Sequence, residues 1–302
     1  MSHKKSVEVI NLDGSNPGLI CDNLPELPIG IQGATGQLVQ GEIPIICGNE
    51  VFSRTDGSCD CFSLKDGQWH SISDLTECRR YPTSTTLFLE HNEEVLLIMG
   101  GRHGSTNVLT IESLNGSQWV QGRFSKMLNP VWEHCLAKIN SSTLLSIGGM
   151  DGGSVYNAVP NTFFFNGQDN KWTEGPTLKN ARTGLSCGVL NWNNPETNQM
   201  EKVVVAAGGY STDTVELLFL DGNKNTGSWI SGPSLPEAAW LSTMIEFQNS
   251  VILIGGELGV DGRHLYQLSS PSGAWVEMKQ TLKEPRVGHM SFLVPDELVN
   301  CH

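Results

Sequence analysis

Five short apolar runs in this chain end at the same signal, a glycine followed by a second glycine or by an asparagine. The pairs are Gly48-Asn49, Gly100-Gly101, Gly148-Gly149, Gly208-Gly209 and Gly255-Gly256. They recur at intervals of about 50 residues, the length of one repeated supersecondary unit. Each run has the length of a buried strand, and each pair lets the backbone turn without a Cβ in the way. The chain is therefore predicted to repeat one small β-unit.

The best-defined copy of this unit lies between Val95 and Trp119. An apolar strand ends at the glycine pair, and an alternating strand follows. Asn115-Gly116 then accepts φ > 0, which predicts a tight hairpin into a strand carrying Trp119. A tryptophan follows every pair, at Trp69, Trp119, Trp172, Trp229 and Trp275. One such sheet cannot bury its own faces, so it needs neighbours of its own kind.

The glycine pairs with their trailing tryptophans resemble the kelch-repeat family. The unit of that family is a four-stranded propeller blade, with a double glycine after the second strand and a tryptophan on the fourth. The resemblance covers nearly the whole chain and implies an all-β fold, a kelch-type β-propeller similar to secreted invertebrate-type kelch proteins. The departure is Asn49, which stands where a second glycine is expected. Asparagine is the next most tolerant residue for a left-handed turn.

The length of 302 residues predicts six blades, although only five complete motifs are present. We expect the sixth blade to be split between residues 1–28 and 283–302. Ser6–Gly14 has the pattern of a third strand and Arg286–Val294 that of a first strand. Joining the two ends would close the ring and remove an open sheet edge. Residues 1–302 are therefore predicted to form a single propeller domain.

The acidic composition bears on the partners. With a formal net charge of −13, nucleic acid and anionic membrane would both be repelled. No apolar run is long enough to span a bilayer, so no membrane insertion is expected. We expect a monomer with a protein or glycan partner. The first residues lack the apolar core of a signal peptide, which taken alone indicates a cytoplasmic protein.

Eight cysteines give the best sequence evidence on compartment. In the blade arrangement they pair as Cys47–Cys61 within one sheet, Cys135–Cys187 between inner strands of adjacent blades, Cys21–Cys301 between the termini, and Cys59–Cys78. An even number at such places favours disulfides and a secreted protein, while the connectivity itself is not fixed by sequence. The alternative is a cytosolic protein in which the cysteines are buried thiols.

Two glycosylation acceptor sequences begin at Asn115 and Asn140. Both fall in hairpins between a first and second or a third and fourth strand, which share one face of a propeller, here called the hairpin face. An insertion in the fourth blade, Asn191–Lys202, lies on the same side and is expected to be a solvated loop. Glycans there would leave the opposite face bare.

The opposite face, here called the loop face, carries the connections between second and third strands and between blades. Loops on a rigid scaffold are the usual carriers of binding, and Arg and Trp often dominate interfaces. The candidate binding residues are Arg80, Tyr81, Arg102, His103, Trp132, Arg182, Tyr210, Trp240, Arg263 and Arg286. Arg182 and Arg286 also match the structural arginine of the kelch family, which ties blades together. Trp132 and Trp240 have no such role and are the favoured ligand contacts.

The sequence favours a non-enzymatic binding module, extracellular, with no cofactor and no metal. Kelch propellers also include copper oxidases and sugar mutarotases, but no tyrosine here lies beside a cysteine and no second close pair completes a metal site around Cys59 and Cys61. His134 and His289 fall on inner strands, where a lone histidine is usually a satisfied core residue. Two alternatives stay open: an intracellular substrate adaptor of a ubiquitin ligase, and a sugar-modifying enzyme of the mutarotase type.

Overall fold

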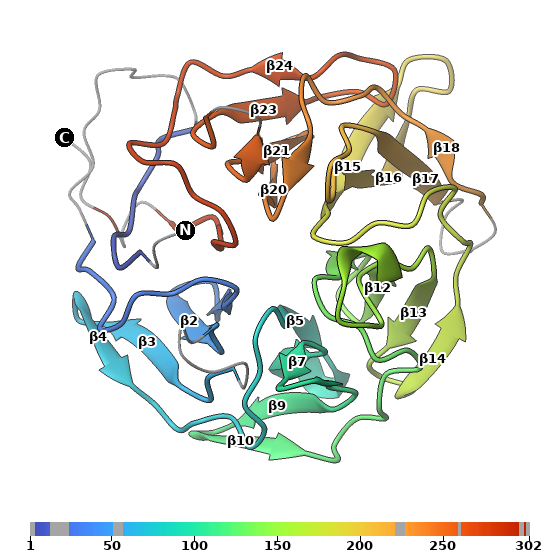
Figure 1. Cartoon of the computed structure of the whole chain (residues 1–302). Helices are drawn as coiled ribbons and strands as arrows, with labels where there is room; N and C mark the ends of the chain where they lie inside the picture. Colours follow the sequence, from blue (N-terminus) through green and yellow to red (C-terminus); the bar gives the residue numbers. More distant parts are fainter. Residues whose placement is uncertain are drawn as a thin grey trace.

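The computed structural model describes residues 4–12, 24–50, 57–220, 227–258, 261–295 and 299. Five four-stranded antiparallel sheets stand around a central opening, like the blades of a propeller (Figure 1). This confirms the predicted all-β propeller. Helix in the described residues is limited to two single 3₁₀ turns, η1 (Glu90–Asn92) and η2 (Val155–Asn157).

In each blade the four strands follow one another in chain order from the opening to the rim. Blades 1 and 2 contain β1 (Thr35–Val39), β2 (Ile43–Cys47), β3 (Cys61–Lys65) and β4 (Gln68–Ser71), then β5 (Thr83–Phe88), β6 (Glu94–Met99), β9 (Ile111–Asn115) and β10 (Gln118–Gln121). Blades 3 and 4 contain β11 (Cys135–Lys138), β12 (Thr143–Ile147), β13 (Thr162–Asn166) and β14 (Lys171–Glu174), then β15 (Ser186–Asn194), β16 (Gln199–Ala207), β17 (Val215–Leu220) and β18 (Ile230–Ser231). Blade 5 contains β20 (Thr243–Phe247), β21 (Ser250–Ile254), β23 (Leu265–Leu268) and β24 (Val276–Glu277). Two short ribbons lie in the connections: β7 (Arg102–His103) with β8 (Thr106–Asn107), and β19 (Ala239–Trp240) with β22 (Glu257–Leu258).

The position between blade 5 and blade 1, here called the sixth sector, holds segments from both ends of the chain (Figure 1). In its described residues, 4–12, 24–31 and 283–295, the strand pairing is one bridge between Lys4 and Ile31. The structure therefore shows five regular blades rather than the six predicted. Pro25 and Pro28 have no N–H to give to a ladder, which is one physical reason for the irregular build.

The sixth sector is nevertheless packed against the blades on both sides. Apolar clusters fill the junctions between neighbouring blades, and two further clusters flank this sector. Ile10 and Leu12 pack against the cluster at blade 5, while Val7 and Met290 pack against that at blade 1. Burial of apolar surface on both sides therefore holds the chain ends in the ring.

The glycine pairs fasten each blade to the next. The N–H of Gly149 donates to the carbonyl of Arg182 at 2.8 Å, and that of Gly209 donates to the carbonyl of Ala239 at 2.7 Å. The first member of each pair has φ between +57 and +70°. A Cβ on Gly148 would lie 2.7 Å from the carbonyl oxygen of Arg182. Glycine alone combines this conformation with so close an approach.

Arginine–glutamate pairs fasten alternate junctions. The pairs are Arg79–Glu112, Arg182–Glu216 and Arg286–Glu8, with N–O distances of 2.6, 3.0 and 2.6 Å. In each case the arginine also donates to the carbonyl two residues before the glutamate. In the first two pairs the glutamate lies on the third strand of a blade. Glu8 therefore takes, in the sixth sector, the place of a third-strand glutamate.

A closed ring of six backbone hydrogen bonds surrounds the loop-face end of the opening. Each member donates its N–H to the member one sector earlier, at distances from 2.7 to 3.4 Å. The members, in order, are Gly33, Tyr81, Glu133, Gly184, Leu241 and Gly288, and the first donates to the last. All six have φ between +49 and +64°. This hydrogen-bonded ring includes the sixth sector, so the circle is complete at its centre.

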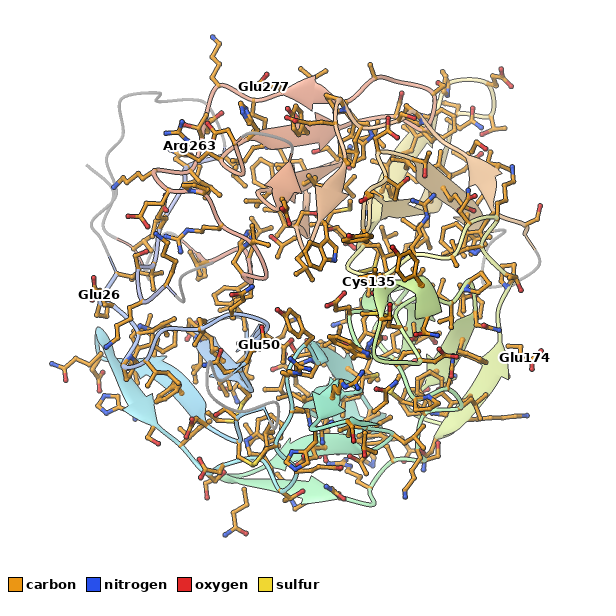
Figure 2. The ribbon with its side chains drawn as sticks, in the orientation of Figure 1. Glu26, Glu50, Cys135, Glu174, Arg263 and Glu277 are labelled. Atoms are coloured by element: carbon orange, nitrogen blue, oxygen red, sulfur yellow. A yellow bond between two sulfur atoms is a disulfide. The ribbon has the colours of Figure 1, made fainter. Side chains whose placement is uncertain are left out.

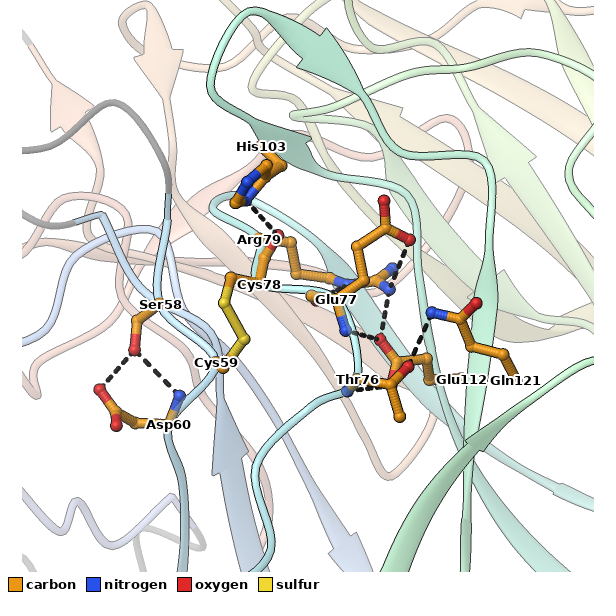
Figure 3. The surroundings of a disulfide bond; sticks show 10 residues. All are labelled: Ser58, Cys59, Asp60, Thr76, Glu77, Cys78, Arg79, His103, Glu112 and Gln121. Carbon is orange, nitrogen blue, oxygen red and sulfur yellow. Dashed lines mark hydrogen bonds and ion pairs between the residues drawn. A yellow bond between two sulfur atoms is a disulfide. The ribbon is translucent and has the colours of Figure 1, made fainter.

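Three disulfides link Cys47–Cys61, Cys59–Cys78 and Cys135–Cys187, three of the pairings expected from the blade arrangement. The fourth, Cys21–Cys301, lies outside the described residues. Cys59–Cys78 holds the connection that leads to the buried Arg79 pair (Figure 3). Among the described residues no helix has the length and apolar character needed to cross a bilayer.

The blade 4 insertion differs from the expected loop. Its residues extend β15 and β16, which pair as far as Asn194 with Gln199. The turn is stabilised locally, because the Asn194 side chain accepts from the N–H of Glu196 at 2.9 Å and donates to Glu201 at 2.7 Å. A polar stretch can form a two-stranded ribbon when its ladder continues one already fixed by a buried sheet.

Candidate functional site

The central opening leads into a cavity of about 450 Å³. It is lined by one inner segment from every sector: residues 33–38, 81–85, 133–138, 184–188, 241–246 and 288–293. Figure 2 shows Glu50 and Cys135 beside the opening, with Glu174 and Glu277 at the outer rim. A cavity of this volume has the size of a small-molecule site, and its loop-face end is the natural place to look for function.

Tyr81 and Glu133 line the loop-face end of the cavity and hold unusual backbone conformations. Their φ values are +49 and +53°, in the left-handed region that a side chain disfavours. The Tyr81 hydroxyl donates to Glu50 at 2.8 Å, and Arg80 forms an ion pair with the same carboxylate. Burial raises the pKa of the Tyr81 phenol well above its usual range. Such strain, held by surrounding structure, is often found at functional sites.

Glu133 is a buried carboxyl, and no basic side chain of the described residues forms an ion pair with it. It is 7% exposed and accepts one hydrogen bond, from the hydroxyl of Thr183 at 2.9 Å. The indole N–H of Trp240 lies close enough to lower the pKa of this carboxyl but does not reach hydrogen-bond geometry. Burial outweighs these effects and raises the pKa of Glu133 to about 7.

Trp132, one of the two favoured ligand contacts, is held by the protein itself. Only 8% of it is exposed, and its indole N–H donates to the carbonyl of Gly152 at 2.9 Å. The guanidinium groups of Arg80 and Arg102 lie 5.3 and 5.1 Å from the ring centroid. Arg102 also donates to two carbonyls of its own loop, at Gly104 and Ser105, and to that of Gly152 in the loop of blade 3. Trp132 and Arg102 therefore tie the loops of blades 2 and 3 together.

Among the described residues, the large aromatic side chains open to solvent on the loop face belong to blades 3 and 4. Tyr210 is 46% exposed and packs edge-on against the half-buried Trp240, with centroids 5.3 Å apart. Tyr156, in η2, is 93% exposed. Trp240 is anchored beneath, because its indole lies directly over Gly184, where a Cβ would be 2.3 Å away. Tyr210 and Trp240 are in contact, and together with Tyr156 from the loop of the neighbouring blade they are here called the tyrosine patch.

The remaining candidates are divided between structure and surface. Arg182 is buried in its ion pair and cannot contact a ligand from there, and Arg286 is largely buried in its pair with Glu8. The arginine equivalent to these two is Arg79, one position before the Arg80 that the sequence suggested. His103 contacts the carbonyl of Cys78 at 3.1 Å (Figure 3), and Arg263 pairs with Asp261 at 2.6 Å on the surface.

His134 and His289 line the cavity, and in the described part of the chain the Nδ1 atom of each is buried without a hydrogen-bond partner, so neither is the fully satisfied core residue that the sequence suggested. Their Nε2 atoms meet the hydroxyls of Thr83 and Thr243 at 2.8 and 3.1 Å. Burial lowers the pKa of both to about 3, so both are neutral at ordinary pH. In the described part of the chain, no group of His, Cys, Asp and Glu side chains could hold a metal ion.

The acidic residues at the opening, Glu50 and Glu133, are absent from the sequence-derived candidates. Neither lies in a recognisable motif. A sequence signal did exist for Glu133, since it occupies the place of Gly184 and Gly288 in the repeat and a charged residue there departs from the pattern. Such a departure at a glycine position indicates a role other than folding.

The ring of blades and its central cavity define a β-propeller. No family model matches the chain, and no curated protein is similar enough to match. Solved structures do match. One is that of YjhT, which superposes with a TM-score of 0.69 at 12% identity, over 92% of this chain and 98% of that one. At this identity the likeness shows the shared propeller fold alone.

Proposed function

We propose that this chain is a non-enzymatic binding module that acts outside the cell and holds a protein or glycan partner on its loop face. The observation that carries the proposal is the tyrosine patch. Large aromatic side chains open to solvent are the residues that most often anchor interfaces. Here they lie on a ring whose blades are joined by hydrogen bonds and disulfides. The entropy lost in ordering the binding surface should therefore be small.

The extracellular location is supported by the three disulfides. Such bridges do not persist in the reducing cytosol, which favours this reading over an intracellular ubiquitin-ligase adaptor. The acceptors Asn115 and Asn140 lie in the β9–β10 and β11–β12 hairpins, away from the tyrosine patch. Glycans at these two positions would leave the patch open.

We also infer that the ring belongs to the kelch type and that the sixth sector is a divided sixth blade. The Arg286–Glu8 pair repeats the contacts of Arg182–Glu216. The indole N–H of Trp69 donates to the carbonyl of Pro25 at 3.0 Å, as that of Trp229 does to Pro176 at 2.8 Å. These repeated contacts support the equivalence of the sixth sector to a blade.

The test is a screen of the purified protein against a glycan array and a library of displayed extracellular proteins. The double variant Tyr156→Ser and Tyr210→Ser should lose at least about tenfold in affinity for any partner found, because two exposed aromatic anchors are removed. Met200→Ser is the matched control, since Met200 is 58% exposed on the hairpin face. A partner lost in the control and kept by the double variant would move the site to the hairpin face.

A second candidate is an enzyme of the sugar mutarotase type, and Glu133 is the observation in its favour. A carboxyl with a pKa of about 7 beside a small-molecule cavity is suited to moving a proton at neutral pH. Interconversion of the α and β anomers of free sialic acid, followed by NMR, is the direct assay. Turnover that disappears in Glu133→Gln would replace the binding module with this enzyme.

A further inference from the structure

We infer that the loop-face end of the cavity binds an organic cation, the alkylammonium or guanidinium group of an amine or of a partner's basic side chain, with Glu133 as its counter-ion. The inference rests on the proposed function, because it names the chemistry that the same face recognises. It is carried by the charges and walls around Glu133.

Among the described residues, no basic side chain forms an ion pair with the carboxyl of Glu133. Arg80 is the basic group there whose charge acts on it, and Arg80 is already paired with Glu50. The repulsion from Glu50 outweighs the attraction from Arg80 at the carboxyl. The adjacent His134 is buried and neutral, and Thr183 offers a hydroxyl only. A buried carboxylate in such surroundings gains most from a cation that arrives with the ligand.

The walls around this carboxyl are those that organic cations prefer. Tyr81 lines the same end of the cavity, and its ring is fixed over Gly33, where a Cβ would lie 2.7 Å away. Trp240 lies over Gly184 and brings its indole N–H toward the carboxyl of Glu133. A cation is attracted by the negative face of an aromatic ring, and the attraction grows where water is excluded; this argument applies to the ring of Tyr81. Both rings are already immobile, so no ordering cost falls on binding.

The whole-molecule charge acts in the same direction. The formal net charge is −13, so a cationic partner is drawn to the protein from a distance and an anionic one is repelled. Arg102, the other cation near the loops, is bound to three carbonyls and to the Trp132 ring. It neither neutralises Glu133 nor offers itself to an anion.

The experiment titrates the whole protein with n-butylammonium and methylguanidinium, followed by NMR and calorimetry, with 1-butanol and butyrate as neutral and anionic counterparts. The cations should bind and the counterparts should not. Because Glu133 must be ionised, affinity should fall about 30-fold between pH 8 and pH 5.5. A capped lysine peptide forms a second arm. Equal affinity for amine and peptide identifies a free amine as ligand, and a preference for the peptide identifies a basic side chain of a protein.

Glu133→Gln should abolish cation binding, and Glu246→Gln is the matched control. Glu246 lines the same cavity, and burial raises its pKa, but it accepts the N–H of Val189 at 2.7 Å and has Lys138 and Lys202 nearby. Binding that survives Glu133→Gln, binding of butanol equal to that of butylammonium, or no pH dependence would each overturn the inference. If Glu133→Gln fails to fold, the pH dependence of cation binding by the natural chain tests the inference instead. Loss of partner binding in the tyrosine-patch variant tests the proposed function separately.

Discussion

Gly149 shows how one residue decides the distance between two segments of a blade. Its φ is +99°, and a Cβ there would lie 2.8 Å from His134 and 2.9 Å from the carbonyl of Trp132, just before β11. A side chain and the backbone of that segment would both have to move to admit the replacement. The glycine is therefore required twice, for its conformation and for its lack of volume.

Replacing Gly149 by valine should cost about 3 kcal/mol or more of unfolding free energy, because backbone strain and a core clash add. Gly116→Val is the control: its φ is +60°, yet nothing lies within 4 Å of the added Cβ. It carries the strain without the clash and should cost less. Urea titration of the two variants measures the difference. Equal losses would mean that conformation alone explains the glycine pairs.

The buried histidines predict how stability depends on pH. His134 and His289 have pKa values of about 3 when folded, against about 6.5 when unfolded. The unfolded state therefore binds more protons between pH 6.5 and 3, and stability should fall as the pH drops through this range. Glu133, raised to about 7, acts in the opposite sense between pH 7 and 4.5. The pKa shifts of the two histidines together exceed that of Glu133, so the net stability should fall on acidification.

Unfolding free energies measured from pH 7.5 to pH 4 check this prediction. His134→Gln should flatten the decline, since one of its two causes is removed. His70→Gln is the control, because His70 is exposed and should leave the slope unchanged. A decline that is the same in all three proteins would assign the acid sensitivity to other groups.

At the scale of elements, Cys135–Cys187 joins the inner strands of two blades. It closes a loop of 52 residues between β11 and β15, whereas Cys47–Cys61 closes 14 residues within one sheet. In the loop-entropy description the longer closure stabilises by about 4 kcal/mol and the shorter by about 3 kcal/mol. The bridge between blades therefore constrains the unfolded chain more than the bridge within a blade.

We expect the double variant Cys135→Ala and Cys187→Ala to be less stable than Cys47→Ala and Cys61→Ala by about 1 kcal/mol in the same model. Urea titration under oxidising conditions measures both. Titration with reductant and alkylating agent adds a kinetic check, since Cys47 and Cys61 are only 1% and 0% exposed and should react last. Early alkylation of these two would show that blade 1 opens readily.

The repeat itself could be predicted from the sequence because its signals are local. The pairs ending in Gly48, Gly100, Gly148, Gly208 and Gly255 mark where strands stop, and no knowledge of neighbours is needed to find them. The insertion in blade 4 was predicted wrongly as a loop. Its polar residues form strands because β15 and β16 extend a ladder begun in the core, and that support is not visible in the local pattern.

The candidate site depends on contacts between blades, which the sequence does not display. That Arg80 and Arg102 lie over the ring of Trp132 could not be predicted from the sequence. Glu133 has no motif, and its importance comes from burial beside Thr183 and Trp240. Loop-face positions could be predicted from the repeat, but which of them are open to solvent could not.

At the scale of the whole molecule, ring closure depends on residues far apart in the sequence. The carboxylate of Glu8 accepts from Arg286 and from the N–H of Lys283 at 2.7 Å. Its side chain is 7% exposed and that of Arg286 is 10% exposed. The Glu8 carboxylate therefore joins the two ends of the chain. Its removal would leave the guanidinium of Arg286 largely buried and without its ion-pair partner.

Glu8→Ala should therefore destabilise the whole propeller by about 3 kcal/mol, because loss of one partner of a buried pair leaves an uncompensated charge. Lys4→Ala is the control, since its bridge to Glu284 is exposed on both sides and should matter little. Calorimetry of both variants measures the loss. A second, separate transition in Glu8→Ala would show that the chain ends can leave while the five blades stay folded.

The hydrogen-bonded ring around the opening has a consequence for how its specificity can change. Each of its six members gives its N–H to one neighbour and its C=O to the other. Every N–H of the circle is therefore in use, so a ligand's acceptor groups can be bound there by side chains only. The backbone of the ring and the side chains at the opening can therefore change independently. A substitution at Tyr81, Glu133 or Leu241 can alter which ligand binds while the hydrogen-bonded ring stays intact.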